Sequence, residues 1–181
     1  LLRRGLLAFD VAAALPEGAT VLSATLELNM SRSNSDGKKV SLHKAKKDWG
    51  EESSDADGEE GGGAPAETGD ATWLHTFSNT GTWDMPGGDY DALESASTVV
   101  GDVGMYSWSS PQMASDVQDW LDGTADNFGW LLLGDESSAA SAKRFDSREN
   151  PEEAKRPVLT VRYVMPLSDY TVFAPLIRAA D

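Results

Sequence analysis

The chain has 181 residues, a hydrophobic fraction of 40% and a formal net charge of −15 at pH 7. This length suits one domain with a sizeable core. The acidic balance argues against nucleic-acid binding, which needs clustered Lys and Arg. Because the chain has no cysteine, it can form neither disulfides nor a thiolate metal site. No apolar run approaches the roughly 18 residues that cross a membrane.

The first quarter of the chain reads as three strands. Residues 1–11 predict a strand, and Pro16 and Gly18 mark a turn. Apolar and polar residues then alternate strictly over 22–30, which predicts a strand with one face in water. A polar turn at 33–38 leads into a hairpin partner over 40–45.

An acidic, glycine-rich stretch follows at residues 51–70, which contain no basic residue. The simplest interpretation is a solvated loop. The alternative is a cation-binding loop, because clustered carboxylates suit Ca²⁺. Asp55, Asp57 and Glu59 come near an EF-hand spacing without matching it. Calcium is therefore the one metal that the sequence leaves open.

The middle of the chain predicts short strands and a single helix. Residues 71–77, 82–84, 96–103 and 104–109 suggest strands. The helix covers 111–122, with Ser110 as N-cap, Pro111 in the first turn and Gly123 after the end. Its apolar stripe is Met113, Val117, Trp120 and Leu121, and the side chains expected to face water are Asp116, Gln118, Asp119 and Asp122.

The segment 127–164 organises the predicted fold. Residues 127–134 are apolar on both faces, which predicts a strand in the middle of a sheet, with Trp130 in the core. Residues 157–164 alternate and predict a half-buried strand. Between them Phe145 is a candidate core residue beneath a salt-bridged rim of Arg144, Asp146, Arg148 and Glu149. Together these patterns predict an all-β, antiparallel β-sandwich of jelly-roll type with one short helix.

Several short motifs occur in a fixed order along this chain. They are Leu6-Leu-Ala-Phe-Asp10, Leu15-Pro-Glu-Gly-Ala-Thr-Val-Leu-Ser-Ala-Thr-Leu-Glu-Leu28, Trp49-Gly-Glu51, Ala71-Thr-Trp73, Gly129-Trp-Leu-Leu-Leu133, Phe145-Asp-Ser-Arg-Glu149 and Arg156-Pro-Val-Leu-Thr-Val161. This series resembles the DNRLRE-type domains of secreted bacterial and archaeal proteins, which are grouped with carbohydrate-binding modules. The resemblance covers residues 1–164 and implies a jelly-roll β-sandwich in an extracellular or cell-surface protein. It does not by itself imply a reaction.

The chain departs from that family at both ends. The one or two strands that usually precede the first motif are absent, and residues 165–181 form a C-terminal extension whose 170–177 part predicts a strand with apolar residues on both faces. A subunit that donates this strand to its neighbour would grow head-to-tail into a homopolymer. The residues expected at this interface are Asp169, Tyr170, Val172, Phe173, Leu176, Ile177, Leu1 and Leu2. The alternatives are a tail that folds back on its own domain and a piece cut from a larger protein.

Aromatic residues suggest a second function. Trp49, Trp73, Trp83 and Trp108 lie in or beside predicted loops, with Tyr90 nearby. Flat rings on rigid loops suit stacking against sugars, although the same residues could plug the ends of the sandwich. The two histidines, His43 and His75, lack a zinc-ligand spacing.

The sequence contains no nucleophile motif, and thirty acidic residues would bring some carboxylates together by chance. We therefore expect a non-enzymatic extracellular subunit that polymerises by terminal strand exchange into a filament or surface layer. The alternatives are a polysaccharide-binding module and, third, a portion of a matrix-degrading enzyme.

Overall fold

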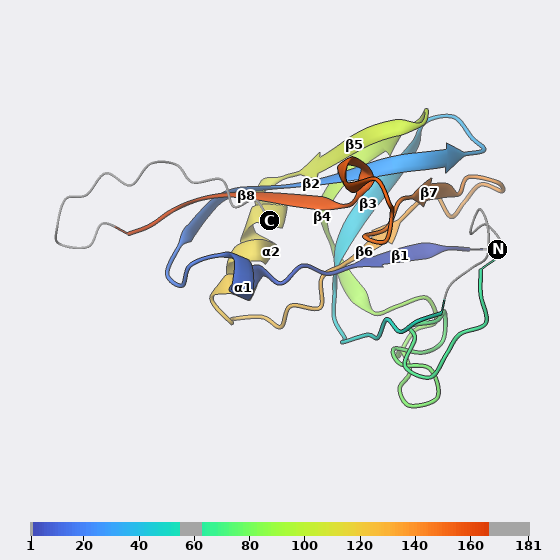
Figure 1. Ribbon diagram of the computed structural model, residues 1–181, viewed down its shortest axis with the longest axis horizontal. Coiled ribbons are helices and arrows are strands. Elements are labelled where there is room, and N and C mark those ends of the chain that lie inside the picture. The colour runs from blue at the N-terminus through green and yellow to red at the C-terminus, as the bar shows by residue number, and fades with distance from the viewer. Residues whose placement is uncertain (1, 55–62, 167–181) are drawn as a thin grey trace.

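A computed structural model describes residues 2–54 and 63–166. It is an all-β antiparallel sandwich of eight strands in two sheets, with one helix longer than four residues in the described part, as the sequence predicted (Figure 1). The first sheet has the order β1 (Arg4–Leu7), β6 (Trp130–Leu133), β3 (Lys38–Ala45) and β4 (Tyr90–Val100). The second contains β5 (Gly104–Ser109), β2 (Thr20–Ser33), β7 (Lys143–Phe145) and β8 (Val158–Val164). The short helices are α1 (Val11–Ala14) and η1 (Glu153–Lys155), and the longer one is α2 (Pro111–Leu121).

The long strand β2 is the centre of the second sheet. It pairs with β5 through Thr25–Met30, with β8 through Thr20–Glu27 and with β7 through Met30–Ser33. Because the β5 and β8 stretches overlap, these strands lie on opposite edges of β2, and β7 continues along the edge that β8 occupies. The alternating residues Ala24, Leu26, Leu28 and Met30 are all buried in the core, so the predicted strand with one face in the core is confirmed.

Strand β6 is internal to the first sheet, as its apolar pattern predicted. Trp130 and Leu132 face the main core, and Leu131 is buried as well. The strand is preceded by Gly129, whose φ of 72° favours glycine. A Cβ at this position would collide with the Leu7 carbonyl oxygen, so glycine lets β1 and β6 approach each other.

Helix α2 begins and ends as the sequence predicted. The Ser110 hydroxyl accepts from the Met113 N–H at 3.0 Å, Pro111 opens the first turn, and Gly123 follows with φ 66°. The Trp120 ring packs on Trp130 at 4.5 Å between centroids. No helix of the described residues is long and apolar enough to cross a membrane.

One prediction about this helix was wrong. Asp116 is 1% exposed instead of facing water. Its carboxylate accepts hydrogen bonds from the Ser95 hydroxyl (2.5 Å), the Trp130 indole N–H (3.1 Å) and the Gln112 amide (3.0 Å). The Lys44 ammonium lies 3.8 Å away. Partners from β4, β6, β3 and the helix itself therefore offset the free-energy cost of burying this carboxylate.

The predicted strands over residues 1–11 and 96–103 also needed correction. Strand β1 ends at Leu7, and α1 follows because the Asp10 carboxylate accepts from the Ala13 N–H at 3.0 Å and caps a helical turn. Strand β4 begins at Tyr90, six residues before the predicted start. It ends at Val100, because residues 101–103 form the connection that leads into β5.

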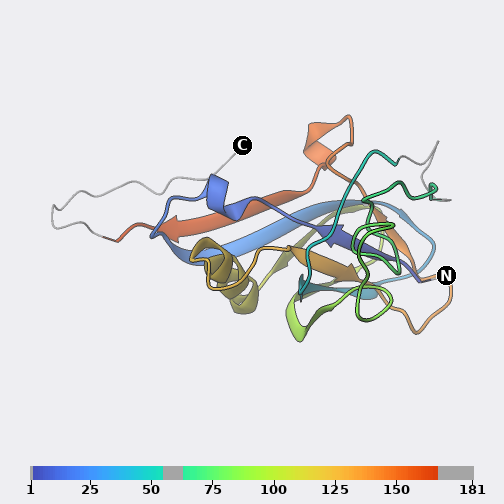
Figure 2. The same cartoon turned by 90° about the horizontal axis from the view of Figure 1, so that it is seen from below.

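Residues 71–84 form no strand apart from an isolated bridge between Phe77 and Gly81. They belong to a folded loop whose hydrogen bonds are mostly internal, such as Ser78 N–H to the Asp70 carbonyl and Trp83 N–H to the Leu74 carbonyl. The loop lies on the outer side of the first sheet (Figures 1 and 2). There Gly88 sits so close to Leu131 that a Cβ would approach its side chain to 2.6 Å.

The segment after β6 agrees largely with the prediction. The Phe145 ring packs edge-on against Trp108 at 5.7 Å, and Arg148 pairs with both Glu149 and Glu51. The Asp146 carboxylate also accepts a hydrogen bond from the Asn29 amide at 2.7 Å. In β8, Val161 is buried, and Leu159 and Tyr163 pack partly buried against the core, as expected.

Candidate carbohydrate-binding site

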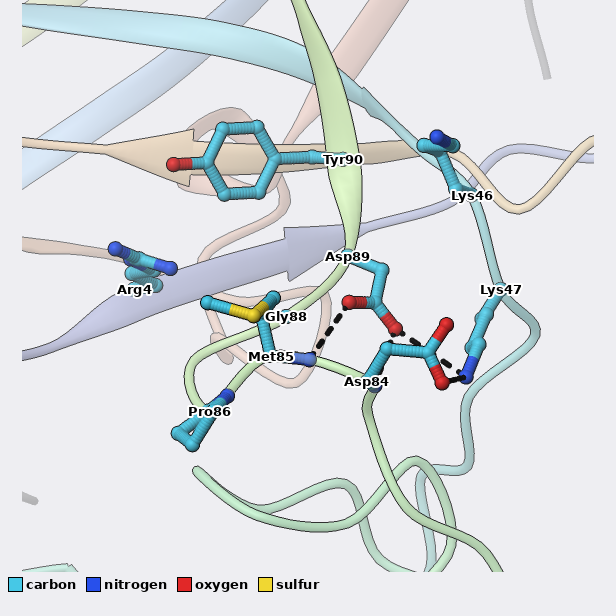
Figure 3. A pocket seen from close by; sticks show the side chains of 9 residues that line it. All are labelled: Arg4, Lys46, Lys47, Asp84, Met85, Pro86, Gly88, Asp89 and Tyr90. Carbon is cyan, nitrogen blue, oxygen red and sulfur yellow. Dashed lines mark hydrogen bonds and ion pairs between the residues drawn. The ribbon is translucent and has the colours of Figure 1, made fainter.

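A shallow hollow of about 460 Å³ opens on the outer side of the first sheet. Its lining comes from three places in the chain: Arg4 on β1, Lys46 and Lys47 directly after β3, and the loop into β4 with Asp84, Met85, Pro86, Gly88, Asp89 and Tyr90. Figure 3 shows these side chains around the opening. The end of β3, the start of β4 and strand β1 thus bring together residues that are up to 86 positions apart.

Arg4 holds the floor of the hollow in place. Its guanidinium donates two hydrogen bonds to the Glu136 carboxylate, at 2.7 and 2.9 Å, and a third to the Gly87 carbonyl at 2.9 Å. It also lies over the rings of Trp73, at 5.1 Å, and Tyr90, at 5.4 Å. The hydrogen bond with Glu136 raises the Arg4 pKa further. A planar cation between two rings fixes both aromatic residues in orientation.

Lys47 and two aspartates form the opposite wall. The Lys47 ammonium lies 2.6 Å from Asp84 and 3.4 Å from Asp89, as the dashed lines in Figure 3 show. The Asp89 carboxylate also accepts from the backbone N–H groups of Asp84 and Met85 at 2.7 and 2.9 Å. Burial alone would raise the pKa of Asp89, but these N–H groups and Lys47 lower it overall. A carboxylate held ionised in this way is poorly suited to donate a proton as a general acid.

Other groups at the hollow are available to a ligand, because they are exposed or make no polar contact within the described part of the protein. The Lys46 side chain is exposed, and neither its ammonium nor the Tyr90 hydroxyl has a hydrogen-bond or ion-pair partner within the described residues. Met85 is 67% exposed and Trp73 is 37% exposed. The site therefore offers apolar surface beside a free donor, a free hydroxyl and the exposed Asp84 carboxylate. This is the mixture that sugar rings and their hydroxyls require.

The structure separates the residues predicted for sugar contact into two groups. Tyr90 lines the hollow, and Trp73 lies next to it, because Arg4 packs over both rings. Trp83 and Trp108 are buried and serve the fold, so they were wrong as a sugar platform, whereas Trp49 lies away from the lining of the hollow and stays a prediction. Trp108 is fully buried and donates to the Val40 carbonyl, and Trp83 is buried and donates to the Thr72 carbonyl. Trp49 is half-buried with its N–H on the Phe128 carbonyl at 2.8 Å. Each indole satisfies its polar atom inside the protein, which is typical of a structural tryptophan.

The remaining predicted residues lie elsewhere or beyond the described part. Leu2 is exposed before β1. Leu1, the calcium candidates Asp55, Asp57 and Glu59, and the tail residues Asp169, Tyr170, Val172, Phe173, Leu176 and Ile177 lie outside the described residues. Over residues 2–54 and 63–166 no three His, Asp or Glu side chains gather as a metal site. His43 instead packs against the Tyr90 ring at 5.2 Å.

The acidic loop is closed by one of its own carboxylates. Asp70 accepts from the backbone N–H of Glu52 at 2.9 Å and of Glu67 at 2.6 Å, and so joins the two ends of the loop. Hydrogen bonds from Ser54 and these two N–H groups lower the Asp70 pKa. At least this member of the acidic stretch is a structural residue.

Sequence reasoning missed Arg4, Lys46, Lys47, Asp84 and Met85. A usable signal was present, because Lys44, Lys46 and Lys47 form a basic group at the end of a predicted strand in an otherwise acidic chain. Compared with known families and with curated proteins, the chain matches no family model and no characterised sequence.

Proposed function

We propose that this protein is a polysaccharide-binding module whose ligand occupies the hollow between Arg4, Lys46 and Tyr90. The observation that carries the proposal is the pairing of two fixed, partly exposed aromatic rings, Trp73 and Tyr90, with the unpartnered Lys46 ammonium. Preformed sites of this kind bind without a large ordering cost.

Each of these groups would have its own part in binding a sugar. The partly exposed Trp73 beside the hollow and the Met85 side chain that lines it would remove the apolar face of a sugar ring from water. The Tyr90 hydroxyl and the Lys46 ammonium would then bind its oxygens. The Arg4 guanidinium is already engaged by Glu136, Gly87 and both rings, so its part is to position the rings.

The binding test uses immobilised or gel-embedded polymers: a neutral β-glucan, a xylan and a uronate polymer. We expect retarded migration in at least one gel and a change in tryptophan fluorescence on titration. Trp73→Ala and Lys46→Ala should each weaken binding about tenfold, which corresponds to about 1.4 kcal/mol. Tyr90→Phe removes only a hydroxyl and should weaken it less.

Two neighbouring variants serve as matched controls. Leu74→Ala removes an exposed apolar side chain next to Trp73 in the chain. Lys39→Ala removes another lysine of β3, the strand that also carries Lys44, and this lysine forms an ion pair with Glu94. Both should bind as the unchanged protein does. Equal weakening by Leu74→Ala and Trp73→Ala, or the absence of binding to every polymer, would overturn the proposal.

The predicted absence of enzymatic activity, the extracellular location and the resemblance to DNRLRE-type domains fit a binding module and stay predictions. Head-to-tail polymerisation also stays a prediction, because all the residues expected to mediate it except Leu2 lie outside the described part.

A further inference from the structure

The outer face of β3 places a serine hydroxyl against an imidazole ring. Val40 and Leu42 of this strand are buried in the core, so Ser41 and His43, which alternate with them, lie on the outer face of the first sheet. Ser41 Oγ lies 3.1 Å from His43 Nε2. Both residues are half-buried and not fully covered, so a small molecule can reach the pair. Neither residue belongs to the lining of the hollow.

The other ring nitrogen determines which way the hydrogen bond between the two side chains runs. His43 Nδ1 lies 2.9 Å from the Asp91 carbonyl oxygen. A carbonyl oxygen only accepts, so in the neutral imidazole Nδ1 carries the hydrogen and Nε2 keeps its lone pair. The Ser41 hydroxyl therefore donates to Nε2. A hydroxyl, a base in hydrogen-bond reach and a third group that orients the base are the parts that nucleophilic catalysis requires.

A bulge in β4 provides the orienting carbonyl. The pairing of β3 with β4 shifts register on both sides of His43, and residues 91–93 of β4 lie opposite Lys44 alone. Such bulges interrupt the ladder and change the direction of nearby groups. The Asp91 carbonyl lies within this bulge and accepts from the ring. The Tyr90 ring packs edge-on against the imidazole at 5.2 Å, so the ring is held from two sides.

We infer that Ser41 is an activated nucleophile with His43 as its general base, and that this pair transfers the acyl group of an aryl ester to water. Ser41 Oγ bonds to the acyl carbon while its proton passes to Nε2. The bond to the phenolic oxygen then breaks, and the phenolate leaves with the electron pair and takes the proton from the imidazolium. Water attacks the acyl-serine in the same way, which yields the carboxylic acid and restores Ser41.

The surroundings of Ser41 explain the choice of an aryl ester. Ser41 lies opposite Ser97 of β4 and opposite Leu133 of β6, so the backbone of β3 is engaged in ladders on both sides at this point. Within the described residues, therefore, no backbone N–H there is free to form an oxyanion hole, and water must solvate the developing charge. A phenolate leaves readily under these conditions, whereas an alkoxide does not. This activity goes beyond the non-enzymatic role expected from the sequence and does not depend on the hollow.

Two probes test the pair in the full-length chain: an alkyl fluorophosphonate, which phosphonylates activated serines, and p-nitrophenyl acetate. We expect a single phosphonyl group on Ser41, located by peptide mass spectrometry, and release of p-nitrophenolate. Ser41→Ala should abolish the label and the release. His43→Gln should slow both about 100-fold, because a general base contributes about 10²–10⁴-fold. Circular dichroism and urea unfolding verify that each variant is folded.

A second hydroxyl–imidazole contact in the chain is a matched control. Thr72 Oγ1 lies 3.0 Å from His75 Nδ1, but the same oxygen accepts from the backbone N–H groups of Leu74 and His75, which engages its lone pairs. Thr72 should therefore stay unlabelled, and His75→Gln should react as the unchanged protein does. Ser97→Ala, which removes the hydroxyl opposite Ser41 on β4, should also have no effect.

Several results would overturn the inference. Absence of label and release, or label spread over several serines, would show that Ser41 is not activated. Equal labelling of Ser41 in His43→Gln and in the unchanged protein would show that the imidazole is not its base. Release of p-nitrophenolate that persists in Ser41→Ala but falls in His43→Gln would show that the imidazole itself takes the acyl group.

Discussion

Replacement of Asp116 by alanine tests the most deeply buried carboxylate of the described core. The side chain is almost fully inaccessible and accepts hydrogen bonds from Ser95, Gln112 and Trp130, while Lys44 lies 3.8 Å away. Its removal leaves one hydroxyl, one indole N–H and one amide without an acceptor. Lys44 would keep two ion-pair partners, Asp91 at 3.9 Å and Asp119 at 3.8 Å.

The magnitude follows from these contacts. Hydrogen bonds to a charged group contribute about 1.5–3 kcal/mol each, and they are not additive. Removing one partner of a buried charged network costs about 3–5 kcal/mol. We therefore expect Asp116→Ala to lower the free energy of unfolding by about 3–5 kcal/mol. For a domain of this size the thermal midpoint would fall by roughly 6–20 °C.

Urea unfolding monitored by tryptophan fluorescence measures this change directly. The midpoint should fall while the slope m stays constant. Asp119→Ala is the matched control, since Asp119 is three positions away on the same helix and equally close to Lys44, but its side chain is 42% exposed. An exposed ion pair contributes at most about 1 kcal/mol. If the two variants lose the same stability, the carboxylate of Asp116 is not what holds α2 against β4 and β6.

Two further predictions concern the backbone and the effect of pH. Gly129→Ala should cost roughly 2–4 kcal/mol, because it combines a positive φ with a collision at the Leu7 carbonyl; a loss below about 0.5 kcal/mol in urea unfolding would contradict this. Hydrogen bonds lower the pKa values of Asp70 and Asp135 in the folded protein, so the unfolded chain binds more protons near pH 4 and the folded state loses stability as the pH falls. Urea midpoints from pH 7 to pH 3 should decrease, less steeply for Asp135→Asn, and a rise on acidification would refute the reasoning.

Much of the fold could be predicted because its signals are local. The alternation over residues 22–30, the two-sided apolar run before Gly134, and the Ser110–Pro111 and Gly123 ends of α2 each depend on neighbours within a few positions. The spacing of apolar residues and the capping of a helix both follow from the geometry of the local backbone, which nearby residues determine. The sequence by itself therefore determined the fold class, the buried strand β6 and the apolar stripe of the helix.

Only the tertiary structure decided the role of the polar and aromatic residues. Trp73 and Trp83 lie in the same loop, yet one is exposed beside Arg4 and the other is buried on the Thr72 carbonyl. The sequence pattern predicts that Asp116 faces water, but in the folded protein β4 and β6 place Ser95 and Trp130 within hydrogen-bond distance of its carboxylate. In each case the environment of a side chain is set by partners far away in the chain, which leave no periodic signal in the sequence. The hollow at Arg4, Lys46 and Tyr90 exists for the same reason, since strand pairing across the first sheet brings its three walls together.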